Sequence, residues 1–364
     1  MVFELASAQR RLGADVEVWT PNALRAGSTE IFDELPIRYF AANPMLGLAC
    51  SFRLKQEIAT LPKTAILHAH NTFNPLNLQV GDAAAEHGLK AFYHPHGALD
   101  PALFADWSPK SLKKRLYIRA FSGPNLNRSA GVFALTPLER NQLLSLGVTA
   151  PIHVVPNGIR PVTVASTEQG LALRRQHGLD ASDRVMLFIG RITPKKRLED
   201  IIQALSLLGA SAPHLFIAGS PKIESDYGEV LFRIVRECGC AARVHWLGFL
   251  DEAAKAAAYA AADVFVHASE SEGMALAILE AMSAGLPVVA TRGCYMTEAA
   301  ATGTLVQCEQ GAAALASAVA PLLADRKAAR AQGHVGQVHA HRVHDWEALA
   351  CATLRIYAET PSRA

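Results

Sequence analysis

The chain has 364 residues, of which 50% are hydrophobic and 19% are charged, and its formal net charge is +2. This length and composition predict a globular protein of two domains, and the near-neutral charge with only 7% aromatic residues disfavours a nucleic-acid-binding protein. Six cysteines are dispersed along the chain without the paired C-x-x-C spacing of a structural zinc site.

The compartment is inferred from three features. No uninterrupted apolar run reaches the about 18 residues that a membrane span needs. The N-terminal segment, MVFELASAQRR, has no long apolar signal core, and dispersed thiols are typical of a reducing compartment. We therefore expect a cytoplasmic protein, with peripheral contact at the inner face of the membrane as an additional hypothesis.

Strand patterns alternate with helical patterns along the chain. Residues 1–12 predict a helix, and strand patterns follow at residues 15–20, 65–70, 90–96, 131–136, 152–156, 185–191, 214–219, 243–248, 263–268 and 286–291. Helices are predicted between them, for example at residues 198–208, 229–238 and 253–262. Such alternation predicts parallel sheets that are covered by helices on both faces.

The alternation forms two blocks, which predict an α/β fold of two doubly wound Rossmann-like domains facing a cleft. A turn-rich joint over residues 157–168 separates the blocks. We expect an N-terminal domain over residues 1–160 and a C-terminal domain over residues 161–342. Residues 343–364 are expected to form a last helix that packs back across the joint.

The beginning of the chain departs from this pattern. A doubly wound domain normally opens with a strand and a glycine-rich turn before its first helix, but here the helical pattern of residues 1–12 comes first. We therefore expect a first domain that lacks its N-terminal strand and glycine-rich loop. A start codon assigned too late is the explanation that we favour over a fragment with a damaged domain.

The segment SESEGMALAILEAMSAGLPVVA, residues 269–290, carries two glutamates eight positions apart, Glu272 and Glu280. A helix is predicted over residues 274–284, since Gly285 suits the position after a helix and a proline follows. Solvated surface glutamates are the simplest alternative. This alternative is less favoured because Glu280 lies among apolar residues, where a buried carboxylate without partners is costly in free energy.

The start of this predicted helix suits an anion. Gly273 allows close approach of the backbone, and the first turn would present three unpaired N–H groups, those of Met274, Ala275 and Leu276. Such donors and the helix dipole favour a phosphate, and nearby carboxylates accept hydrogen bonds from hydroxyl groups. A ligand with a sugar, a diphosphate and a ribose in a row would satisfy both glutamates and the amides.

A basic turn supports the same ligand. In FIGRITPKKRLEDIIQAL, residues 188–205, Gly190 and Arg191 stand at the end of a predicted strand, and Lys196 follows Pro194. Ligands of doubly wound domains bind at the carboxyl ends of strands. Arg191 could grip phosphate oxygens with two hydrogen bonds, and Lys196 adds a mobile positive charge. A solvated basic turn is the alternative.

These motifs together resemble a known family. The pattern G-R-x4-K followed by E-G-x-x-L-x-x-L-E-A-M-x-x-G-x-P-V-V is similar to that of the retaining GT-B glycosyltransferases of family 4, the group 1 glycosyltransferases. Shorter matches occur at His96-Gly97, Pro156-Asn157-Gly158, Trp246-Leu247-Gly248 and Trp346. The resemblance covers residues 1–358 and implies two Rossmann-like domains, the first for the acceptor and the second for a nucleotide sugar.

The resemblance implies a role for each matched residue. Arg191 and Lys196 would hold the donor diphosphate, and Glu280 would meet the ribose. Glu272 would meet the transferred sugar, with the backbone of Gly273, Met274, Ala275 and Leu276 beside the phosphate. The backbone of Gly248, Phe249 and Leu250 would border the base.

Histidines in the first domain are further candidates. His96 stands at the end of predicted strand 90–96, where a capped structural histidine is the usual finding, but the resemblance implies that it contacts the sugar or helps the acceptor. His70 and His94 are weaker candidates. The pairs His68/His70 and His94/His96 each share one side of a strand, so a metal site is an alternative that we do not favour. The same holds for His339, His341 and His344.

We therefore predict a retaining glycosyltransferase that moves a sugar from a nucleoside diphosphate sugar to a glycan or lipid-linked acceptor, without a metal or other cofactor. Bacterial surface polysaccharide synthesis is the pathway that the resemblance suggests. The basic segment of residues 108–121 predicts either a solvated helix face or docking to an anionic membrane. A nucleotide-sugar epimerase of the same fold, or a truncated protein that binds nucleotide sugar without catalysis, remains an alternative.

Overall fold

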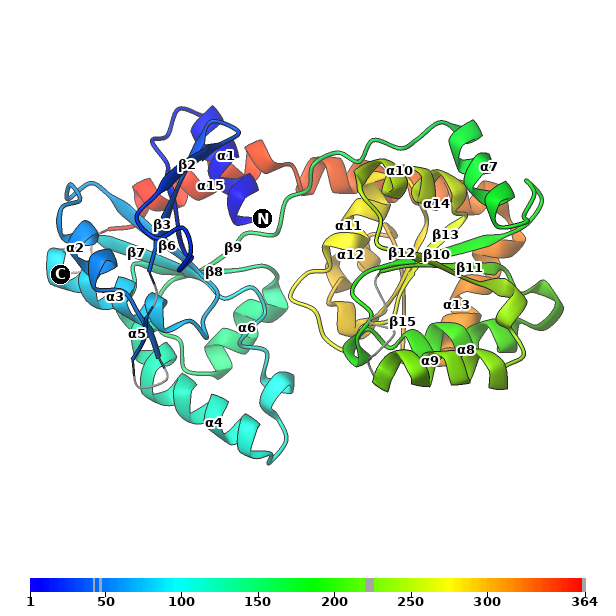
Figure 1. The fold of residues 1–364 in the computed structure, drawn as a ribbon, viewed down its shortest axis with the longest axis horizontal. Helices are drawn as coiled ribbons and strands as arrows, with labels where there is room; N and C mark the ends of the chain where they lie inside the picture. Colours follow the sequence, from blue (N-terminus) through cyan, green and yellow to red (C-terminus); the bar gives the residue numbers. More distant parts are fainter. Residues whose placement is uncertain (42, 46–47, 220–225, 362–364) are drawn as a thin grey trace. The chain divides into compact units, whose positions relative to one another are not determined.

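The computed structural model describes residues 1–41, 43–45, 48–219 and 226–361. The chain divides into two compact units (Figure 1). Unit 1 comprises Met1–Gly158 and Trp346–Ala364, and unit 2 comprises Ile159–Asp345.

Unit 2 is built on one parallel sheet. Its six strands lie in the order β12-β11-β10-β13-β14-β15. Their bounds are β10 Val185–Ile189, β11 His214–Ala218, β12 Val244–Gly248, β13 Val264–His267, β14 Val288–Thr291 and β15 Val306–Cys308. Counted from β10, this is the order 3-2-1-4-5-6 of a doubly wound sheet, with its switch point between β10 and β13.

Helices cover both faces of the unit 2 sheet. They are α7 Thr167–Gln176, α8 Leu198–Leu208, α9 Asp226–Glu237, α10 Glu252–Ala261, α11 Leu276–Ser283, α12 Thr297–Ala301, α13 Ala312–Ala324 and α14 Arg326–Val343. In β10, Met186 and Phe188 pack with α8, α9 and α13, whereas Val185 and Leu187 pack with α10, α11 and α14. Because both faces are buried, the strands are continuously apolar, which is why the sequence predicts them well.

Unit 1 contains three separate sheets among its described residues. The largest is parallel, with the order β6-β7-β8-β9, and the others have the orders β1-β3-β2 and β4-β5. The bounds are β1 Val18–Pro21, β2 Thr29–Phe32, β3 Leu35–Phe40, β4 Asn43–Met45, β5 Leu48–Cys50, β6 Ile66–His70, β7 Lys90–His94, β8 Gly131–Ala134 and β9 Ile152–Val154.

Helices of unit 1 also cover two faces of its parallel sheet. They are α1 Val2–Arg11, α2 Phe52–Ala59, α3 Pro75–His87, α4 Pro109–Tyr117, α5 Gly123–Arg128, α6 Pro137–Ser145 and α15 Trp346–Glu359. Phe92 and Phe133 pack with α1 and α15, and Tyr93 and Val132 pack with α2, α3, α5 and α6. The last helix therefore completes the core of unit 1.

The α/β class with two Rossmann-like domains is confirmed. The element order also begins as expected, with α1 followed by β1, and β1 and β6 belong to different sheets. The absence of a first strand and glycine-rich loop stays a prediction. No helix in the described part of the chain is long and apolar enough to cross a membrane.

Two predicted boundaries are wrong at positions that matter for the site. Predicted strand 90–96 ends at His94, because Pro95 has no N–H for the ladder, and His96 then takes a positive φ of 57°. Predicted helix 274–284 begins only at Leu276, since Ala275 is extended at φ −77° and ψ 103°. Met274 and Ala275 therefore belong to the loop before α11.

Candidate functional site

The candidate site of unit 2 lies at the switch point of the sheet. The strands β10 and β13 are parallel neighbours, and each is followed at its carboxyl end by a loop that carries charged residues. The first loop runs from Gly190 into a short 3-10 turn, Pro194–Lys196, and the second runs from Ala268 to the start of α11. This is the edge at which doubly wound folds bind ligands.

Backbone hydrogen bonds fix the second loop. The N–H of Glu270 donates to the carbonyl of Lys195 at 3.0 Å, and the N–H of Glu272 donates to the carbonyl of Gly293 at 2.9 Å. Gly293 lies so close to the backbone of this loop that an added Cβ would stand 2.3 Å from the carbonyl oxygens of Ser269 and Glu270. The loop before α11 is therefore held by neighbouring turns, which explains the late start of the helix.

Lys196 and Glu272 form an ion pair across the two loops. Lys196 Nζ lies 2.5 Å from Glu272 Oε1, and the two side chains are 13% and 15% exposed. His267, at the end of β13, is buried, and its Nε2 lies 3.6 Å from the same oxygen and 3.4 Å from Lys196 Nζ. Three charged or polar groups thus converge where β10 and β13 end.

The surroundings of this pair fix its protonation. Burial alone would raise the pKa of Glu272, but the His267 hydrogen bond and the charge of Lys196 outweigh it and hold that pKa well below the usual value. Burial lowers the pKa of His267, and the Lys196 charge adds to this effect against the pull of Glu272. At neutral pH Glu272 is therefore a carboxylate beside the neutral imidazole of His267.

The start of α11 presents unpaired donors. The backbone N–H groups of Met274, Ala275 and Leu276 donate to no described residue, and Ala275 provides no side-chain cap. Free N–H groups and the helix dipole attract an anion. The expected anion site therefore persists, although only Leu276 of the three belongs to the helix itself.

Glu280 lies one turn inside α11 and has a lysine of its own. Lys255 Nζ lies 3.2 Å from Glu280 Oε2, and the hydroxyl of Tyr259 donates to the same oxygen at 2.9 Å. Burial alone would lower the pKa of Lys255, but Glu280 raises it above its ordinary value. Burial, and then the charge of Glu280, raise the pKa of Tyr259. The apolar setting of Glu280 is thus offset by two partners from α10.

Other predicted residues of unit 2 are more exposed. Arg191 is exposed and forms no ion pair with a carboxylate of the described chain. After β12, Gly248 has a φ of 69°, Phe249 is 84% exposed, and Leu250 packs on the core. Arg191 and Phe249 are therefore available to a ligand, whereas Leu250 contributes to packing.

His96 belongs to a histidine pair in unit 1. Its Nε2 lies 2.9 Å from Nδ1 of His70, and burial lowers the pKa of His96 to about 3. The following N–H, that of Gly97, donates to Glu139 at 2.6 Å. Burial also raises the pKa of Glu139. This carboxyl orders the turn that carries His96.

Sequence reasoning missed four of these residues: His267, Lys255, Tyr259 and Glu139. His267 carried one signal, as the only polar residue in the apolar strand Val264–His267. Lys255 and Tyr259 lie i and i+4 on α10, which places both side chains on one face, but nothing local indicates which carboxylate they meet. Their role depends on how α10 packs against α11.

Comparison with known proteins gives the family. The model described as "Glycosyl transferases group 1" matches residues 171–337, and the "Glycosyl transferase 4-like domain" matches residues 1–158. A D-inositol 3-phosphate glycosyltransferase 2 of Catenulispora acidiphila is 34% identical over 389 residues, which cover 99% of this chain and 89% of that relative. The chain belongs to the group 1 glycosyltransferases. The family resemblance seen in the sequence is thereby confirmed.

A second curated relative and two solved structures are also similar to this chain. A D-inositol 3-phosphate glycosyltransferase of Segniliparus rotundus is 31% identical over 245 residues, which cover 65% of this chain and only 53% of that relative. Sucrose-phosphate synthase of Thermosynechococcus elongatus superposes with a TM-score of 0.78 at 22% identity, covering 98% of this chain and 92% of that structure. Anabaena HepE in complex with UDP-glucose superposes with a TM-score of 0.72 at 22% identity, covering 89% of this chain and 86% of that structure. These structures share the GT-B fold.

Gly293 offers a test of the loop geometry. In Gly293→Ala, the added Cβ meets two backbone carbonyls that cannot move aside cheaply, so the loop must shift and Glu272 with it. We expect a lower Tm and a Lys196–Glu272 contact that is lost in a crystal structure of the variant. The control is Arg292→Ala, which removes only an exposed ion pair with Glu309 and should leave Tm nearly unchanged. An undisturbed Glu272 in Gly293→Ala would contradict the assigned loop packing.

Proposed function

We propose that this group 1 glycosyltransferase moves a sugar from a nucleoside diphosphate sugar to a glycan or lipid-linked acceptor, with retention of configuration at the anomeric carbon. The observation that carries the proposal is the Lys196–Glu272 pair beside three unpaired backbone N–H groups at the switch point of unit 2. The UDP-glucose bound by Anabaena HepE, which shares the fold, makes UDP the first nucleotide to test.

The donor diphosphate is assigned to the positive groups of this edge. Lys196 is charge-balanced by Glu272 when no ligand is bound, so the unpaired amides before α11 and the exposed Arg191 supply the remaining attraction for phosphate oxygens. Phe249 and the backbone of Gly248 and Leu250 would border the base. The resemblance supports the same assignment.

The two glutamates are assigned to hydroxyl groups of the donor. Lys196 and His267 both contact Oε1 of Glu272, and Lys255 and Tyr259 both contact Oε2 of Glu280. Each carboxylate is therefore held through one oxygen, which leaves the other oxygen to accept from a ligand. Glu272 would accept from the transferred sugar and Glu280 from the ribose.

The proposed reaction needs charge stabilisation more than a nucleophile. As the bond to the diphosphate breaks, negative charge grows on the leaving group, and Arg191, Lys196 and the amides would stabilise it in place. The acceptor hydroxyl would attack from the face that the diphosphate leaves, which gives retention, with Glu272 positioning the sugar. These groups supply the positive charge, so no metal is needed in this scheme. His96 of unit 1 is proposed to contact the sugar or the acceptor, on the family resemblance alone.

Site substitutions test these roles. Arg191→Ala and Glu272→Ala should each lower turnover of UDP-glucose by about 10²–10³-fold, because each removes a preorganised charge from the donor site. Glu270→Ala is the matched control, since that carboxylate lies on the same loop but is exposed and, within the described residues, forms an ion pair with Arg197 alone. Turnover is measured as UDP release with a bacterial lipid extract as acceptor. Near-normal rates in Arg191→Ala or Glu272→Ala would remove the assignment.

The lipid-linked acceptor is supported by an exposed surface on α4 and its flanks, the α4 surface. It consists of Trp107, Lys110, Leu112, Lys113, Leu116, Arg119 and Phe121. Trp107 is 88% exposed and Leu116 is 60% exposed, which is unusual for such side chains on a solvated helix face. Apolar groups interleaved with lysine and arginine suit the interface of an anionic membrane, where a lipid-linked glycan of surface polysaccharide synthesis would be found.

Vesicle flotation tests this surface. We expect the protein to float with vesicles that contain anionic phospholipid and to remain behind with purely zwitterionic vesicles. The double variant Trp107→Ser/Leu116→Ser should lose flotation, whereas Leu207→Ser, which changes an exposed leucine of unit 2, should keep it. Equal and negligible binding to both kinds of vesicle would contradict the membrane assignment without affecting the donor site.

A further inference from the structure

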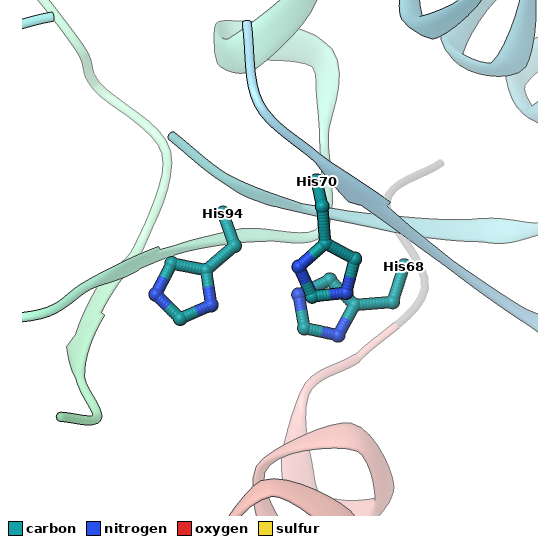
Figure 2. Close-up of side chains that lie close together, drawn as sticks. All are labelled: His68, His70 and His94. Carbon is teal, nitrogen blue, oxygen red and sulfur yellow. The ribbon is translucent and has the colours of Figure 1, made fainter. Parts of the chain in front are cut away.

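Three histidines gather on one face of the parallel sheet in unit 1. The strands β6 and β7 pair so that His70 lies opposite His94 and His68 lies opposite Phe92. Alternate residues of a strand share a face, so His68, His70 and His94 all point to the side that α1 and α15 cover. Figure 2 shows the three imidazole rings side by side.

The three rings are spaced closely enough to share one ion. One ring nitrogen from each lies within 4.8 Å of one from each of the others. Nitrogens that ligate one Zn²⁺ at about 2.0–2.1 Å in tetrahedral geometry stand roughly 3.4 Å apart, so modest rotations of the side chains would close the set. Among the described residues, no other histidine, cysteine or carboxylate group has this arrangement.

Two ring nitrogens of this cluster are buried without a partner among the described residues. A neutral imidazole keeps one lone pair that can bind a metal. Nε2 of His68 and Nε2 of His94 are buried without a hydrogen-bond partner in the described chain. Buried polar atoms are rarely left in that state, and a bound cation would satisfy both.

Neighbouring groups select the ligating form of two rings. Tyr357 Oη lies 2.6 Å from Nδ1 of His68, and His96 Nε2 lies 2.9 Å from Nδ1 of His70. If each Nδ1 carries the hydrogen and donates it to that neighbour, each Nε2 is left with a lone pair for a metal. Metal-binding histidines in proteins are oriented by partners of this kind.

We propose that His68, His70 and His94 form a site for a divalent transition metal ion, Zn²⁺ in the first instance, that is separate from the donor site of unit 2. Three neutral imidazoles suit Zn²⁺, Co²⁺, Ni²⁺ or Cu²⁺ and disfavour Mg²⁺ or Ca²⁺, which prefer oxygen ligands. The fourth ligand would be water from the small cavity that these rings line together with His96 and Thr353. The ion would join β6 and β7 and, through Tyr357, help to orient α15.

Binding of the metal alone to the full chain tests the proposal. We expect metal-stripped protein to bind one Zn²⁺ per chain in calorimetry and to gain Tm. With Co²⁺ it should give the visible absorption of a four-coordinate site with three nitrogen ligands and one oxygen ligand. His94→Ala should abolish the site. Tyr357→Phe keeps the ring and its packing but removes the hydroxyl next to His68, and should weaken Zn²⁺ binding by about 10–100-fold.

A second histidine pair provides the control. His214 Nδ1 and His245 Nε2 lie 3.0 Å apart in unit 2, outside the proposed cluster. His245→Ala should therefore leave Zn²⁺ binding unchanged. The proposal is overturned if the unsubstituted chain binds no stoichiometric Zn²⁺, if His70→Asn and His94→Ala both retain binding, or if His245→Ala abolishes it. None of these readouts uses glycosyl transfer, so the result is independent of the proposed function.

Discussion

The ion pair between Lys196 and Glu272 is the interaction on which the candidate donor site depends. Both side chains are largely buried, and a buried charge is tolerated only when a partner compensates it. The pair joins the loop after β10 to the loop after β13. These loops are neighbours because β10 and β13 are adjacent parallel strands at the point where the strand order reverses. Removing one partner of such a pair typically lowers the free energy of unfolding by about 3–5 kcal/mol. The contact therefore stabilises the two loops and also fixes the position of the charged groups.

The same arrangement, a carboxylate held by a lysine and a second polar side chain, occurs once in the loop before α11 and once within α11. Glu272 is held by a lysine and a histidine, and Glu280 is held by a lysine and a tyrosine, in each case through one oxygen. This arrangement keeps two carboxylates ionised and oriented in a mainly apolar unit. It also balances the charge of both lysines, so the unpaired backbone amides and the exposed Arg191 are the donors left for an anion.

Much of the fold of unit 2 could be predicted from the sequence, since its strands are continuous apolar runs. Helix α8 has the predicted bounds, residues 198–208. The strand β3 was missed because Pro36 stands inside it and because four of its six residues are only partly buried. The start of α11 was misplaced because the loop is held by Gly293, a tertiary contact with no local signal. The partners of Glu280 were missed for the same reason, as their contacts depend on the packing of α10 against α11.

Calorimetric titration with UDP and with uridine tests the central claim most directly, because the two ligands differ only in the diphosphate. If the turn after β10 and the amides before α11 hold that group, UDP binds much more tightly than uridine. The Arg191→Ala variant should then lose most of this difference in affinity. Equal affinity for UDP and uridine, or a difference that Arg191→Ala leaves intact, would contradict the assignment of the diphosphate to this edge of unit 2.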